Sequence, residues 1–217
     1  MNERNYQKEL EAIIDNKDNF GKRLLLHSCC APCSSYVLCY LSTFFDITVF
    51  YYNPNITDEN EYDHRIKEQK RLIDTLNTDG YVPEWAACRG DRINIKLIEG
   101  DRDVDAFYAM SRGLEKVPEG GSRCEGCFGL RLQKTWELAR KEGFDLFGTT
   151  LTISPMKNAK LINSVGERIA KNGDNAPMWM PSDFKKKDGY RHSIELSAKY
   201  DLYRQNYCGC EFSVNNR

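Results

Sequence analysis

Short apolar runs alternate along the chain with longer segments that carry apolar side chains on one face. The run 24–27 (Leu-Leu-Leu-His) has the composition of a buried strand, and 47–52 is rich in β-branched and aromatic residues. Pro32 suits the first turn of a helix, and Gly143 suits the end of another. The further strand candidates are 93–98, 144–147 and 178–180, and the expected helices are 32–45, 58–77, 104–112, 124–142, 159–171 and 192–204.

Strands that alternate with helices of this length indicate an α/β fold, with a parallel sheet and helices on both of its faces. With 217 residues and no repeat or long linker, the chain is expected to form a single domain, 1–217. Within it, 1–22 forms an N-terminal extension and 151–217 a basic C-terminal portion. Because ligands of such sheets bind beyond the carboxyl ends of the strands, a site is expected directly after Leu26.

Composition narrows the class of protein further. A hydrophobic content of 41% with 12% aromatic residues excludes an intrinsically disordered chain. The formal charge is −1, but 151–217 carries 11 Lys and Arg against 7 Asp and Glu, and this local excess of +4 permits contact with nucleic acid. The most apolar stretch, 36–52, is interrupted by Asp46, and the polar residues 1–19 do not read as a signal peptide. We therefore expect a cytoplasmic protein without a membrane span.

The nine cysteines are too few for a disulfide scaffold, and in a reducing compartment clustered cysteines bind metal or do redox chemistry. Three of them, Cys29, Cys30 and Cys33, lie at the first strand-to-helix turn. A nucleotide-binding domain would have glycines there, yet no glycine occurs within 24–45, which disfavours a phosphate site. Since the helix dipole favours thiolates at a helix N-terminus, these thiols are expected to be reactive or metal-bound.

A second group of cysteines, Cys124 and Cys127, begins a predicted helix as a Cys-Glu-Gly-Cys motif, so that both side chains share one face. Together with Cys29 and Cys30 they supply four thiolates, which fit either a structural zinc or an iron–sulfur cluster. Zinc ribbons separate their cysteine pairs by about 15–20 residues, whereas 90 residues separate Cys33 from Cys124. The spacing therefore favours a cluster over zinc, with metal-free thiols as a third reading.

The third group is Cys208-Gly209-Cys210. Residues i and i+2 of an extended segment lie about 6.6 Å apart, at the upper edge of disulfide geometry, and Gly209 allows a bend that brings them closer. A strained bridge of this kind cycles readily between its oxidised and reduced forms; a further pair of metal ligands is the alternative. Cys39 is expected in the core, and Cys88 is assigned no role.

Lysines and arginines alternate with aromatic residues in the basic C-terminal portion. Such a pattern is most often a solvated face, but lysines for phosphates beside aromatics for unstacked bases also suit a single-stranded RNA loop. Both readings are open at this point. The candidate RNA contacts are Lys157, Lys185, Lys186, Lys187, Tyr190, Arg191 and Arg204.

Taken together, these segments resemble the cobalamin-independent epoxyqueuosine reductases, the family that performs the last step of queuosine synthesis in tRNA. The resemblance spans about 24–213, nearly the whole chain, with the motifs in the same order. The matching pieces are 24–30 with the Cys-Cys pair, 51–55 (Tyr-Tyr-Asn-Pro-Asn), 123–127 (Arg-Cys-Glu-Gly-Cys), 148–157, 183–190 and 202–210.

The resemblance implies reduction of the cyclopentane epoxide on the wobble base to the alkene of queuosine, with tRNA carrying epoxyqueuosine as the substrate and no use of ATP. It implies a fold similar to that of the ATP pyrophosphatases (adenine nucleotide α-hydrolase-like). Some members of the family have Asp where this chain has Cys33, which leaves that thiol as a ligand to an additional iron or as a spare. The implied site residues are Cys29, Cys30, Cys124 and Cys127 for a [4Fe–4S] cluster, and Cys208 and Cys210 for a redox-active disulfide.

Turning an epoxide into an alkene and water takes two electrons and two protons, the amount that one dithiol releases on becoming a disulfide. We therefore expect electrons from an external donor to enter at Cys208 and Cys210, with the cluster as the reducing centre. Asp183 and His27 are candidates for protonating the departing oxygen. The alternatives are an iron–sulfur-dependent tRNA sulfur transferase, against which the missing ATP loop counts, and a zinc-bound RNA-binding module.

Overall fold

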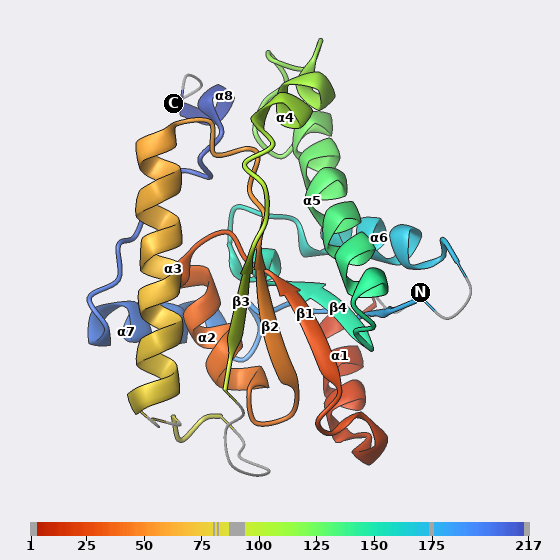
Figure 1. Ribbon diagram of the computed structural model, residues 1–217, viewed down its shortest axis with the longest axis vertical. Coiled ribbons are helices and arrows are strands. Elements are labelled where there is room, and N and C mark those ends of the chain that lie inside the picture. Colours follow the sequence, from red (N-terminus) through yellow and green to blue (C-terminus); the bar gives the residue numbers. More distant parts are fainter. Residues whose placement is uncertain (1–3, 80, 82, 87–93, 174–175, 215–217) are drawn as a thin grey trace.

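The computed structural model describes residues 4–79, 81, 83–86, 94–173 and 176–214. Its centre is a five-stranded parallel sheet in the order β3-β2-β1-β4-β5 (Figure 1). The strands are β1 (Arg23–His27), β2 (Asp46–Tyr51), β3 (Lys96–Glu99), β4 (Leu146–Thr149) and β5 (Met178–Trp179). The helices are α1 (Tyr6–Asp15), η1 (Lys17–Asn19), α2 (Ala31–Leu41), α3 (Glu59–Asp79), α4 (Val104–Ser111), α5 (Ser122–Lys141), η2 (Thr150–Ile153), α6 (Ala159–Ala170), α7 (Gly189–Lys199) and α8 (Glu211–Val214).

Helices cover both faces of the sheet, and the central strand β1 contributes to two separate cores. Leu24 and Leu26 join the core formed with α1, α2 and α7, while Leu25 joins the core formed with α5 and α6. This alternation follows from the strand geometry, in which successive side chains point to opposite faces. A run of leucines is therefore needed where both faces are covered, as in other parallel sheets. The expected α/β fold is confirmed.

Most predicted elements match observed ones, with shifted ends. The stripe Phe128, Leu132, Trp136 and Ala139 is buried along α5, and Gly143 ends this helix with a φ of +69°. The helix expected over 32–45 ends at Leu41, and the strand expected over 144–147 is formed by Leu146–Thr149. The third strand begins at Lys96; Ile93, Gly80 and Cys88 lie outside the described residues.

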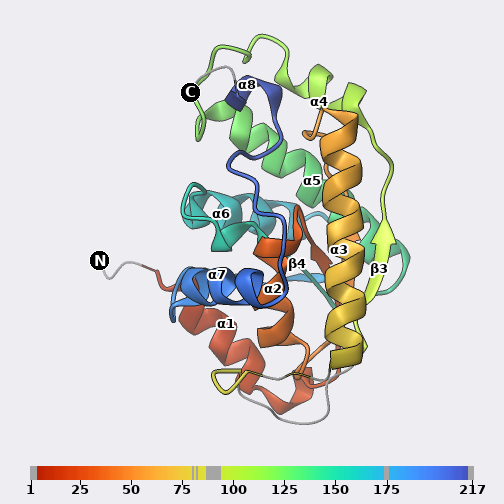
Figure 2. The same ribbon diagram turned by 90° about the vertical axis from the view of Figure 1, so that its left-hand side faces the viewer.

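The prediction of a last helix over 192–204 was wrong at both ends. α7 begins at Gly189 and ends at Lys199, because Tyr200 leaves the helical region and Asp201 adopts a left-handed φ of +48°. Residues 202–208 form neither helix nor strand. They run along α3 toward α8 (Figures 1 and 2), and we call residues 200–208 the C-terminal strap.

The expected N-terminal extension, 1–22, contains α1, which packs onto the domain. Asn5 caps this helix by accepting a hydrogen bond from the Lys8 amide, and Leu10 and Ile14 enter the core. Among the described residues, none of the helices combines the length and the apolar character that crossing a bilayer requires.

The strand order places the candidate site. After β1 the chain moves to β2 on one side, and after β4 it moves to β5 on the other, so the loops that follow β1 and β4 diverge at the carboxyl edge of the sheet. In open parallel sheets this point of divergence forms the ligand-binding crevice. The cysteines that follow β1 lie at this edge.

Candidate active site

The turn after β1 brings three thiols together. β1 ends at His27, Cys30 takes the N-cap position of α2, and Pro32 occupies the first turn of the helix. The sulfurs of Cys29, Cys30 and Cys33 all lie within 4.8 Å of one another, and those of Cys29 and Cys30 are 3.7 Å apart. Such a group can hold a metal ion.

Hydrogen bonds distribute the charge among these three sulfurs unequally. Bonds from the Cys30 and Cys33 thiols lower the pKa of Cys29 well below its ordinary value, and the positive charges of Lys157 and Arg131 act in the same direction. The contact with Cys29 raises the pKa of Cys30 to about 11 and that of Cys33 well above its ordinary value. These contacts therefore favour ionisation of Cys29 over that of Cys30 and Cys33.

The Cys-Glu-Gly-Cys motif occupies the first turns of α5. The Gly120 amide donates to the sulfur of Cys124 at 3.2 Å, and Cys127 is buried, which raises the pKa of its thiol. Arg123 is also buried and donates to the carbonyls of Leu114, Glu115 and Val117. These bonds fix the loop that leads into α5, and with it the position of Cys124.

Two adjoining cavities connect the three cysteine motifs. One of about 210 Å³ is bordered by Cys29, Cys33 and Cys208. The other, of about 40 Å³, is bordered by Cys124, Cys127, Cys208 and Cys210. They share the walls formed by Glu119, Arg131, Met156, Lys157 and Cys208.

Lys157 lies between the sulfur groups. Burial opposes its charge, but the sulfurs of Cys29, Cys33 and Cys208 outweigh burial and raise its pKa. Within the described residues, Cys29, Cys30 and Cys33 are the one group of three or more potential ligands within 4.8 Å of one another. The four-thiol cluster set with Cys124 and Cys127 thus stays a prediction.

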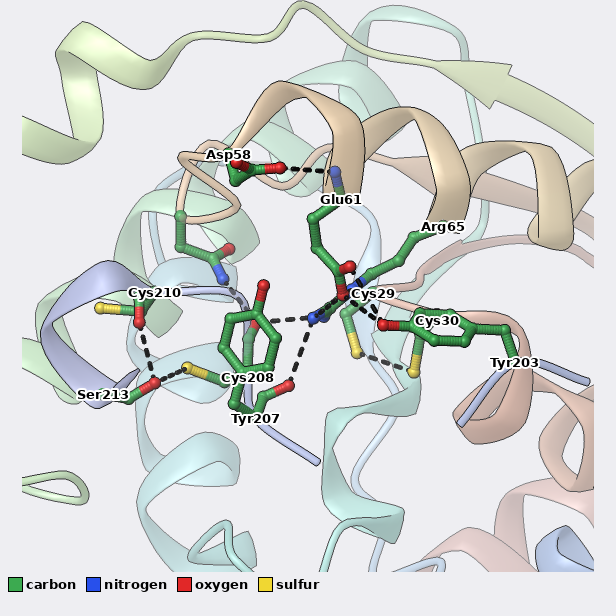
Figure 3. Close-up of polar contacts among 11 residues, drawn as sticks. Cys29, Cys30, Asp58, Glu61, Arg65, Tyr203, Tyr207, Cys208, Cys210 and Ser213 are labelled. Carbon is green, nitrogen blue, oxygen red and sulfur yellow. Dashed lines mark hydrogen bonds and ion pairs between the residues drawn. The ribbon is translucent and has the colours of Figure 1, made fainter. Parts of the chain in front are cut away.

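The Cys208–Cys210 segment is bent at Gly209, which has a φ of +94°, and both cysteines are thiols. Figure 3 shows the Cys208 sulfur directed toward the Ser213 hydroxyl, at 3.3 Å. A hydrogen bond from Cys210 lowers the pKa of Cys208 well below its ordinary value, with Lys157 adding to the effect, and the same contact raises the pKa of Cys210. Cys208 is half-buried and borders both cavities, whereas Cys210 is buried against Phe107 and Cys127.

Three of the RNA-contact candidates border the larger cavity, namely Lys157, Tyr190 and Arg204. Tyr190 is 37% exposed, and the guanidinium of Arg204 lies 5.9 Å from the centre of its ring. Arg204 also donates to the Ser197 hydroxyl at 3.0 Å. Because the chain leaves the helical path after Lys199, Arg204 lies at the cavity instead of on α7.

The remaining basic candidates have acidic partners or lie outside the cavity. Lys185 forms an ion pair with Asp183 at 2.9 Å and donates to the Thr152 carbonyl at 2.9 Å, so it braces the loop after β4. Lys187 pairs with Glu11 on α1, Arg191 pairs with Glu195 at 3.3 Å, and Lys186 is exposed.

His27 is placed as a structural residue. It is fully buried, with Nδ1 2.9 Å from the Thr149 hydroxyl and Nε2 3.2 Å from the Tyr52 carbonyl. Burial, together with the charge of Arg131, lowers the pKa of His27 to about 3. The ring is neutral, and its single N–H, on Nε2, is held by the Tyr52 carbonyl, which disfavours His27 as the proton donor.

Sequence reasoning missed the side chains that hold the thiols in place. Arg65 and Asn55 both donate to the Cys208 carbonyl, at 3.3 and 3.1 Å, and Arg131 borders both cavities. Asn55 lies in a loop motif that the sequence flags, but Arg65 sits on a charged helix of ordinary appearance. Its role depends on a contact 143 residues along the chain.

The sequence of the chain is similar to those of known proteins. A sequence model of the family "Epoxyqueuosine reductase QueH" matches residues 24–216. An epoxyqueuosine reductase QueH of Streptococcus pyogenes serotype M1 is 41% identical over 212 residues, which are 97% of this chain and 78% of the relative. That of Staphylococcus epidermidis is 40% identical, covering 97% and 84%, and that of Thermotoga maritima is 30% identical, covering 89% and 91%. The chain therefore belongs to the epoxyqueuosine reductase QueH family.

Proposed function

We propose that the chain reduces epoxyqueuosine in tRNA within the cavities that its three cysteine motifs border. As a member of this family it is an oxidoreductase of queuosine biosynthesis. Family membership favours this activity over a sulfur transferase or a zinc-bound RNA-binding module. The observation that carries the proposal is the convergence of the motifs from the β1–α2 turn, the start of α5 and the C-terminus on adjoining cavities with a common wall.

The donor set fits an iron–sulfur cluster. Cys29 at the larger cavity, Cys30 with its sulfur 3.7 Å from that of Cys29, and Cys124 and Cys127 at the smaller cavity would hold a [4Fe–4S] cluster through four thiolates. The positive charges of Lys157 and Arg131 beside Cys29 support the thiolate form that such ligands need. When bound, the cluster supplies electrons one at a time. Cys33 either holds an additional iron or is a spare thiol.

The Cys208–Cys210 pair is proposed as the dithiol through which electrons enter. Formation of a disulfide releases two electrons and two protons, which is what the conversion of the epoxide to an alkene and water consumes. An external reductant then restores both thiols. Its access is through Cys208, since Cys210 is only 6% exposed.

The tRNA base would enter the larger cavity after leaving its stack. Tyr190 offers a ring face for stacking, and Arg204 offers a guanidinium for phosphate or for base edges. With His27 disfavoured, Asp183 is the remaining candidate for the proton donor. It forms an ion pair with Lys185, which donates to the Thr152 carbonyl in the loop after β4.

Metal analysis of anaerobically purified protein tests the proposal. We expect about four iron and four sulfide for the cluster, and the Cys124→Ala variant should lose iron and turnover. Cys39→Ala is the matched control, because Cys39 is fully buried and borders neither cavity. A colourless protein that contains one zinc, or full iron content in Cys124→Ala, would contradict the proposed centre.

A further inference from the structure

Two arginines of α3 bind the C-terminal strap, and each of them forms an ion pair with a glutamate of the same helix. Near its start, Arg71 pairs with Glu68 at 2.9 Å and donates to the carbonyls of Tyr200 and Asp201 at 3.0 and 2.9 Å. The Arg71 side chain is 45% exposed. We call Arg71 the outer anchor; it contacts the start of the strap, whereas Cys208 lies at the end of the strap.

The second anchor, Arg65, lies at the end of the strap and is buried. Its side chain is 1% exposed, pairs with Glu61 at 2.6 Å, and donates to the carbonyls of Tyr207 and Cys208, each at 3.3 Å (Figure 3). A buried charge is costly unless paired and hydrogen-bonded, and these three acceptors meet that requirement. The planar guanidinium therefore fixes two consecutive peptide groups directly before Gly209.

Neighbouring contacts complete the seat of the thiol pair. Asn55 donates to the same Cys208 carbonyl at 3.1 Å, and the Thr57 amide donates to the Gly209 carbonyl at 3.4 Å. The loop between β2 and α3 thus holds the bend at Gly209 through two hydrogen bonds. Arg65 also borders the larger cavity, together with Cys29 and Cys208.

We propose that Arg65 is a positioning residue that holds the Cys208–Cys210 bend in the geometry from which its disulfide forms; the inference rests on the redox role of this pair under the proposed function. A constraint that keeps two thiols together raises the effective concentration of one at the other. Loss of the constraint then makes the disulfide less stable relative to the dithiol. The effect requires the contact at the Cys208 carbonyl and is absent at the outer anchor.

Redox titration of the anaerobic, iron-loaded protein tests this inference. The wild type and the variants Arg65→Gln, Arg65→Lys and Arg71→Gln are equilibrated in glutathione buffers of graded ratio, acid-quenched and alkylated. Trypsin cleaves after Arg204, so the peptide 205–217 contains Cys208 and Cys210 and no other cysteine. Its disulfide fraction gives the equilibrium constant of this pair alone.

We expect Arg65→Gln to lower the equilibrium constant for the disulfide about tenfold, or about 30 mV for a two-electron couple. Arg65→Lys keeps the buried charge but cannot serve both carbonyls, so it should shift the constant in the same direction, and it stands in if Arg65→Gln does not fold. Arg71→Gln should stay within about twofold of the wild type. Iron content should be equal in all four proteins.

The inference would be overturned if the equilibrium constant of the disulfide were the same in the wild type and in both Arg65 variants. It would also be overturned if Arg65→Gln and Arg71→Gln shifted the constant equally, because that result would indicate a general loosening of the strap. A wild-type pair that forms no disulfide at any buffer ratio would instead refute the proposed redox role itself. The two failures are thus distinguished by the wild type alone.

Discussion

Replacing Gly209 with alanine should destabilise the protein by about 2–4 kcal/mol. A left-handed backbone costs an L-residue about 1–2 kcal/mol, of which the stiffer unfolded chain returns about 0.4–1 kcal/mol. The added Cβ would also lie 2.8 Å from Cγ1 of Ile56 and 3.4 Å from Nη1 of Arg65. Ile56 is fully buried, and forced displacement in a packed core adds roughly 1–3 kcal/mol.

Gly21→Ala provides the matched control, because Gly21 has a φ of +75° and a Cβ there would meet no atom within 4 Å. It isolates the backbone cost, at about 1 kcal/mol or less. For a chain of this length 1 kcal/mol corresponds to about 2–4 °C in Tm. Anaerobic thermal unfolding at equal iron content should therefore show a fall of about 4–16 °C for Gly209→Ala. Equal shifts in the two variants would refute the tight seating of Gly209 on Ile56.

Three further predictions concern chemistry, RNA binding and pH. Cys208→Ser should retain iron and bind tRNA yet fail in multiple turnover with a thiol reductant; parallel loss of iron and activity would identify the pair as metal ligands. Arg204→Gln should weaken tRNA binding and reduce the slope of log Kd against log salt by about 0.7 per lost phosphate contact, with an unchanged cluster spectrum. Because burial lowers the pKa of His27 to about 3, the unfolded chain binds a proton there between about pH 3 and 6.5 that the folded chain does not. The unfolding free energy should then decrease on acidification through this window, by up to about 1.4 kcal/mol per pH unit, and the slope should be smaller in His27→Asn.

The pattern of apolar residues predicted those helices and strands whose burial follows directly from that pattern. Leu24, Leu25 and Leu26 can only be buried on both sides, which identifies a central strand of a covered sheet. The amphipathic α5 and its glycine end were equally readable. Helix α1 was not predicted because charged and polar residues separate its apolar ones, and only the assembled core shows that Leu10 and Ile14 are buried.

The candidate site was readable to the extent that its chemistry lies in short motifs. The grouping of Cys29, Cys30 and Cys33 follows from their spacing at a helix start. The meeting of the three motifs at adjoining cavities depends on tertiary packing, as do the partners of Lys185 and Arg65. A lysine in a basic run and an arginine on a charged helix have no local signature of such roles.

The order of synthesis gives the C-terminal strap a special place in the maturation of the protein. The ribosome adds about 5–20 residues per second from the N-terminus, so β1, β2 and α3 leave the exit tunnel well before residues 205–208. The larger cavity lacks part of its wall until the strap binds Arg65. The missing part is contributed by Gln205, Tyr207 and Cys208. The nascent chain therefore presents Cys29 and Cys33 through a wider opening than the finished protein has. Metal delivered during this interval would reach Cys29 and Cys33 before the strap lines the cavity. Docking of the strap would then be the last step in the assembly of the site.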